Sequence, residues 1–155
     1  MKNFLNSNQL KLIAVCAMIF DHLLWVIKPG YNNGTAYLIL HTFGRIVAPI
    51  FCFFIAEGAY YTHSRKKYLS RLLIFALISH FAYCFAFGIN FIPFSTGTFF
   101  NQTSIMWPLA LGLIGIIVQD SNIKNIWKTI ITLLLCVLGF PSDWSSVAVM
   151  IIIYN

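Results

Sequence analysis

Six ionisable side chains lie inside stretches of the sequence that are otherwise apolar: Asp21, His22, His41, Arg45, Glu57 and His80. An ionisable residue in such surroundings is energetically unfavourable, so a functional role is the first hypothesis. A histidine that is oriented by a carboxylate can act as a general base and take a proton from an amine or hydroxyl nucleophile. A nearby lysine or arginine can hold the anionic groups of a donor molecule.

The first apolar stretch, from about residue 10 to residue 27, puts two candidates on one helical face. Lys11 and His22 are eleven residues apart. At about 3.6 residues per turn this is close to a whole number of turns, and it corresponds to about 16 Å along a helix axis. Asp21 is adjacent to His22. We expect Asp21 either to orient the His22 ring or to pair with a cation on a neighbouring helix.

The second apolar stretch, from about residue 36 to residue 61, supplies that cation. His41 and Arg45 are four residues apart and share a helical face. Helices joined by a short connection usually pack together, so we expect both histidines at the same depth as Asp21 and Arg45. The structural alternative is an Asp21–Arg45 ion pair that locks two helices, with His22 merely hydrogen-bonded.

Two further polar residues have simpler interpretations. Glu57 lies one turn before a basic loop, and an interfacial salt bridge to Arg65 or Lys66 is its simplest role. His80 is alone in a third apolar stretch, where a hydrogen bond between helices is typical. The four cysteines form no CxxC pair, so no metal site is predicted.

The elements that carry these residues follow from composition. The chain has 155 residues, of which 59% are hydrophobic and 9% are charged, whereas about a quarter of a soluble domain is charged. We therefore predict an all-α, polytopic transmembrane bundle of about six helices, near residues 10–27, 36–61, 68–87, 104–118, 126–140 and from 144 onwards. The last apolar run reaches the end of the sequence, so we expect an incomplete helix. Residues 1–155 then form a single transmembrane domain, either complete or part of a longer chain.

The distribution of basic residues predicts the topology. The net charge is +6, and its main cluster follows the second predicted helix: Arg65, Lys66, Lys67 and Arg71. Basic loops stay in the cytoplasm, so this loop and the N-terminus are both expected there. The bases form no continuous basic face, which argues against nucleic acid as a partner. Anionic membrane lipid is the expected one.

Three runs of the sequence, in order, resemble the TraX family. They are residues 10–22, which end in Asp21 and His22, residues 43–51 followed by Ala56-Glu57-Gly58, and residues 61–72 with their basic cluster. The resemblance covers most of the first hundred residues and continues weakly to Asp143. It implies N-acetylation of a conjugative pilin. It also implies a relation to wider transmembrane acyltransferases, which have a basic residue and a histidine eleven residues apart on an early helix.

The resemblance implies a bacterial inner-membrane acetyltransferase with acetyl-CoA as the cytosolic donor. The acceptor would be an amine or hydroxyl at the outer face, on a pilin-like protein, a glycan or a lipid. His22 would be the base and Asp21 its partner. The candidate cofactor-binding residues are Lys11, Arg45, Arg65 and Arg71, and the candidate substrate-binding residues are His41 and Glu57. The alternative is a non-enzymatic membrane protein, either a proton-coupled carrier or an assembly subunit, with a structural Asp-His-Arg cluster.

Overall fold

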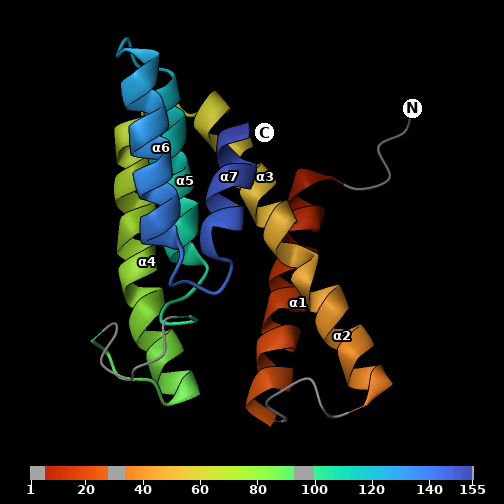
Figure 1. Cartoon of the computed structure of the whole chain (residues 1–155). Helices are drawn as coiled ribbons and strands as arrows, with labels where there is room; N and C mark the ends of the chain where they lie inside the picture. The colour runs from red at the N-terminus through yellow and green to blue at the C-terminus, as the bar shows by residue number, and fades with distance from the viewer. Residues whose placement is uncertain (1–5, 28–33, 93–99, 155) are drawn as a thin grey trace. The chain divides into compact units, whose positions relative to one another are not determined.

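The structure, a computed structural model, describes residues 6–27, 34–92 and 100–154. These residues form seven α-helices (Figure 1): α1 (Ser7–Ile27), α2 (Thr35–Arg45), α3 (Val47–Tyr61), α4 (Arg65–Phe87), α5 (Met106–Gln119), α6 (Asn125–Gly139) and α7 (Ser145–Tyr154). Within the described ranges there is no strand, only an isolated bridge between Thr103 and Ser142. The predicted all-α class is confirmed.

Three segments are long and apolar enough to cross a membrane: Asn8–Ile27, Leu38–Tyr61 and Arg65–Phe87. Many of their large apolar side chains are exposed, among them Leu12 at 65% and Phe85 at 84%. In water such a surface would be strongly unfavourable, whereas hydrocarbon accommodates it. The described part of the chain is therefore a multipass membrane protein. Helices α5, α6 and α7 are apolar but have only 14, 15 and 10 residues.

The second predicted helix is divided into α2 and α3 at Ile46. Pro49 has no N–H, so it cannot bond the carbonyl of Arg45, four residues earlier, where α2 ends. The Ile46 N–H instead donates to the carbonyl of Phe43 at 3.3 Å, in a tighter turn. Proline thus explains why one apolar run forms two helices.

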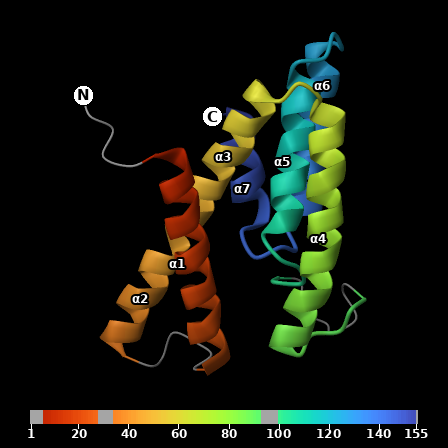
Figure 2. The ribbon, with the colours of Figure 1, turned by 180° about the vertical axis from the view of Figure 1, so that it is seen from behind.

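The chain divides into two compact units, the first up to Phe51 and the second from Cys52 onwards. In the first unit, α1 and α2 lie side by side (Figures 1 and 2). Gly44 of α2 faces Asp21 of α1, and a Cβ atom at Gly44 would lie 2.5 Å from the Cβ atom of Asp21. The absence of a side chain at Gly44 therefore permits this close approach.

The second unit is arranged around α5, which contacts α4, α6 and α7. Residues 108–113 of α5 are all buried. Leu111, Leu135 of α6 and Val149 of α7 form a buried apolar cluster. At Gly112 an added Cβ atom would meet the side chain of Ile152 at 2.6 Å, so the glycine lets α7 pack closely on α5.

His80 ties α4 to the segment before α5. Its Nε2 atom donates to the carbonyl of Phe91 at 2.9 Å, because a carbonyl can only accept. In the neutral ring, Nδ1 then accepts from the hydroxyl of Thr103 at 3.1 Å. The ring thus bridges two segments of the second unit.

Candidate functional site

Asp21 and His41 form a buried pair between α1 and α2. The His41 Nδ1 atom lies 3.0 Å from Asp21 Oδ1, and the side chains are 1% and 14% exposed. An ionised carboxylate only accepts, so Nδ1 donates. The ring centroids of Trp25 and His41 are 4.8 Å apart, in a tilted arrangement. The sequence had left open whether Asp21 would bind His22 or a cation. The structure gives it a histidine on the second apolar segment.

His22 is oriented by the backbone of its own helix. Its Nδ1 atom lies 2.9 Å from the carbonyl oxygen of Met18, one turn earlier on α1. Since the carbonyl can only accept, Nδ1 carries the proton, and in the neutral ring Nε2 carries the lone pair. This is the protonation state that a general base requires. The orienting group is therefore a carbonyl, where the sequence had suggested the carboxylate of Asp21.

The two cations predicted for this region lie on the surface of their helices. Lys11 is exposed on α1, and the helix is continuous from there to His22, which keeps the predicted spacing. Arg45 is the last residue of α2 and is also exposed. From the sequence we expected His41 and Arg45 at one depth and named Arg45, not His41, as the cation that would pair with Asp21, so the sequence missed the Asp21–His41 contact. The signal it missed was Gly44, whose missing side chain admits Asp21.

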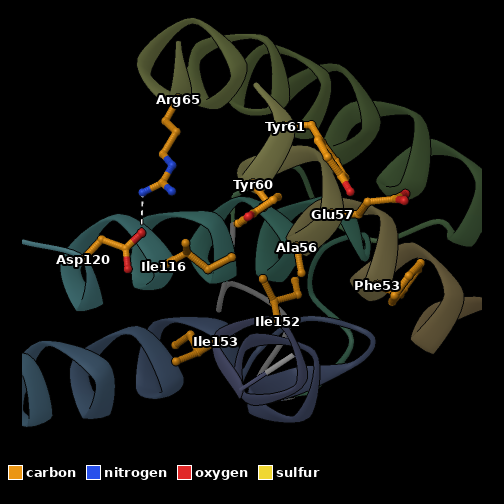
Figure 3. A pocket seen from close by; sticks show the side chains of 10 residues that line it. All are labelled: Phe53, Ala56, Glu57, Tyr60, Tyr61, Arg65, Ile116, Asp120, Ile152 and Ile153. Carbon is orange, nitrogen blue, oxygen red and sulfur yellow. Dashed lines mark hydrogen bonds and ion pairs between the residues drawn. The ribbon is translucent and has the colours of Figure 1, made fainter. Parts of the chain in front are cut away.

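In the second unit, Glu57 and Arg65 line a cavity of about 450 Å³ (Figure 3). One wall is aliphatic, with Ile116, Ile152 and Ile153. Ala56 is the other small apolar residue of the lining, and the remaining residues are aromatic or charged: Phe53, Tyr60, Tyr61 and Asp120, with Glu57 and Arg65. The cavity is thus amphipathic.

Arg65 is held at the edge of this amphipathic cavity by two acceptors. Its Nε atom donates to the carbonyl of Ala59 at 3.0 Å. Its guanidinium group pairs with Asp120, the residue after α5 (Figure 3). The acidic partner of Arg65 is therefore Asp120, whereas the sequence had suggested Glu57.

A second, smaller cavity of about 290 Å³ lies where α3 passes into α4. It is lined by Thr62, His63, Ser64, Lys67, Tyr68 and Arg71. Arg71, a predicted cofactor-binding residue, thus lines a different cavity from Arg65. We call this the basic cavity.

Fold and site together define a multipass α-helical membrane protein with a buried Asp–His pair, a backbone-oriented histidine and two cavities in the unit that carries the basic loop. The chain belongs to the TraX family, described as TraX protein, whose match covers residues 6–155. The predicted resemblance is confirmed.

A relative in Dichelobacter nodosus carries the name probable fimbrial assembly protein FimC, serogroup H1. It is 32% identical to this chain over 139 residues, which are 88% of this chain and 55% of the relative. The chain therefore spans about half the length of that relative. No solved structure matches the chain.

Proposed function

We propose that this chain carries the base of a membrane-embedded acetyltransferase. It would move an acetyl group from cytosolic acetyl-CoA to an amine or hydroxyl at the outer face of the bacterial inner membrane, with the N-terminus in the cytoplasm. Membership of the TraX family supports the class of reaction. The observation that carries the proposal is the hydrogen bond from His22 Nδ1 to the carbonyl of Met18, because it supports the neutral tautomer in which the basic lone pair is on Nε2.

The reaction needs one proton acceptor. Nε2 of His22 takes the proton from the acceptor amine or hydroxyl as its nitrogen or oxygen attacks the acetyl carbonyl. The new C–N or C–O bond forms, and the thioester C–S bond breaks. The proton held on His22 then passes to the departing thiolate. The products are the acetylated acceptor and coenzyme A, and the imidazole returns to its neutral form.

Asp21 acts on the acceptor side through His41. The carboxylate fixes the His41 ring in one orientation, as second-sphere carboxylates commonly do for imidazoles. We assign Asp21 as a positioning residue and His41 as a contact for the acceptor. A pilin-like protein is the acceptor that we favour, because the relative is named for fimbrial assembly.

The donor side uses the cations and the amphipathic cavity. Lys11, Arg45, Arg65 and Arg71 are the candidate contacts for the phosphates of acetyl-CoA. The aliphatic wall of the amphipathic cavity suits the pantetheine arm, and Glu57 lines the same cavity.

The proposal is tested with the detergent-purified chain, acetyl-CoA and a pilin N-terminal peptide, with released thiol as the readout. We expect His22→Ala to lower the rate by at least about a hundredfold, the usual contribution of a positioned base. His80→Asn is the matched control, since it changes another histidine in an apolar helix. A folded His22→Ala variant with the wild-type rate would exclude His22 as the base.

A non-enzymatic role is favoured by one observation, the buried Asp21–His41 pair, because such pairs also serve as proton relays in membranes. The chain would then be a proton-coupled carrier or an assembly subunit. This alternative requires that acetyl-CoA does not raise the unfolding temperature of the purified chain. A rise that depends on acetyl-CoA concentration would count against it.

A further inference from the structure

The basic cavity differs in charge from its larger neighbour. Two of its six lining residues, Lys67 and Arg71, are cationic, and a third, His63, has an imidazole side chain. The other three, Thr62, Ser64 and Tyr68, carry hydroxyl groups. None of these six described residues is acidic, whereas Glu57 and Asp120 line the amphipathic cavity. The lining therefore offers several donors and a positive field.

Arg65, at the start of α4 and outside the basic cavity, already has an acidic partner. Arg65 is paired with Asp120 and also donates to the carbonyl of Ala59. Lys67 and Arg71 lie four residues apart on α4, so their side chains project from one face. Both are exposed, and a ligand can reach them from water. Lys67 and Arg71 thus offer a ligand two cations on one face of α4, beside the hydroxyl groups of the lining.

The position of Tyr68 depends on a glycine of α3. A Cβ atom at Gly58 would lie 2.9 Å from the Tyr68 hydroxyl oxygen, so the missing side chain gives that hydroxyl its place. Ser64 caps α4 and accepts from the Lys67 N–H at 3.5 Å, which fixes the start of the helix beside the cavity. Gly58 therefore leaves room for the Tyr68 hydroxyl, and Ser64 caps the helix that carries Lys67 and Arg71.

We propose that the basic cavity binds a phosphate group. Phosphate oxygens accept several hydrogen bonds at once, and a lysine with an arginine and hydroxyl donors matches that need. A cavity of about 290 Å³ is large enough for a phosphate with part of the molecule that carries it. The cavity binds the same chemical group whether or not the chain transfers acetyl.

Two molecules at a membrane surface present this group. One is the 3′-phosphate of coenzyme A, and that source rests on the proposed function. The other is the headgroup phosphate of an anionic lipid. Titration of the purified chain with coenzyme A and with 3′-dephospho-coenzyme A tests the first. Its thermal unfolding in phosphatidylglycerol and in phosphatidylcholine nanodiscs tests the second.

Lys67→Gln and Arg71→Gln are the test variants, and Lys66→Gln is the matched control. Lys66 is adjacent and exposed, but it does not line the basic cavity. We expect each test variant to weaken binding of the phosphate-bearing probe by about tenfold, the effect of losing one charged hydrogen bond. Lys66→Gln should leave binding nearly unchanged.

A preference for coenzyme A over its dephospho form that is lost in Lys67→Gln identifies the nucleotide phosphate. Stabilisation by phosphatidylglycerol that is lost in the same variant identifies the lipid phosphate. If neither probe is preferred, or if Lys66→Gln weakens binding as much as Lys67→Gln, the inference is wrong. Coenzyme A carries no acetyl group, so a chain that binds it but transfers nothing would contradict the proposed function and leave the phosphate site intact.

Discussion

At the scale of single residues, the two histidines of the first unit are fixed by different acceptors. His22 donates to a backbone carbonyl of α1, and His41 donates to the carboxylate of Asp21. The hydrogen bond from His22 to the backbone forms within α1, so it does not depend on the position of the neighbouring helix. The carboxylate bond also links α1 to α2, so it contributes to the stability of the first unit as well as to the orientation of His41.

We expect Asp21→Ala to lower the stability of the purified chain more than Asp21→Asn does. The asparagine side chain keeps an oxygen that can accept from His41 Nδ1, whereas alanine removes the acceptor that the structure gives this atom. The difference should be on the order of 1 kcal/mol, as for hydrogen bonds within membrane bundles. Thermal unfolding in detergent measures it. Equal midpoints for the two variants would show that this hydrogen bond does not stabilise α1 against α2.

At the scale of helices, glycines decide how closely neighbours approach. Gly44 admits Asp21 between α2 and α1, and Gly112 admits Ile152 between α5 and α7. In lipid there is little hydrophobic drive between helices, so close packing and polar contacts hold them together. The Asp21–His41 pair depends on such an approach, because a hydrogen bond tolerates little extra separation.

Gly44→Ala should therefore destabilise the chain by about 1–3 kcal/mol, the usual effect of overpacking. An added Cβ atom there meets the Cβ atom of Asp21, which is fixed to the backbone of α1. Gly58→Ala is the matched control, since its nearest neighbour is the hydroxyl at the end of the Tyr68 side chain, which can move. The thermal unfolding midpoints of the two variants in detergent test this expectation. A larger loss in Gly58→Ala would be inconsistent with the close α1–α2 contact.

At the scale of the whole molecule, the apolar surface and the basic loop define how the chain lies in the membrane. α4 has 23 residues, which at about 1.5 Å per residue is enough to cross a hydrocarbon core of about 30 Å. The two ends of α4 should therefore be on opposite sides. The bases that the sequence had suggested for a loop, Arg65, Lys66, Lys67 and Arg71, form the first two turns of α4, so we expect the start of α4 in the cytoplasm.

Single cysteines test this orientation. In a chain whose four native cysteines are replaced by alanine, Asn90→Cys should react with a membrane-impermeant maleimide in intact cells. Lys66→Cys should react only after the cells are lysed. Both positions are exposed. Lys66 lies in the first turn of α4, and Asn90 lies shortly after its last residue, Phe87. The reverse pattern would place the N-terminus and the basic loop on the outside.

The sequence alone determined the class of fold and the family. Its low charge and long apolar runs exclude a soluble domain whatever the tertiary structure. The ends of α1 and α4 follow from those runs, whereas both helices start three residues earlier than the runs had predicted. The relative placement of Lys11 and His22 also followed from the sequence. In an unbroken helix the number of residues between two positions determines both their separation along the axis and whether they share a face. The division at Ile46 could have been expected from Pro49.

Only the tertiary structure decided which polar groups meet. His41 and Arg45 lie on one face of one apolar segment, and from the sequence we named Arg45 as the cation for Asp21, whereas the structure shows a hydrogen bond between Asp21 and His41. The choice depends on how closely α1 and α2 approach at Gly44. In the same way, Arg65 forms its ion pair with Asp120, which is far away in the sequence, whereas the sequence had suggested Glu57 as its partner. Helical periodicity determines on which face of its own helix a side chain lies. The register and distance between helices come from packing, and these determine the pairs.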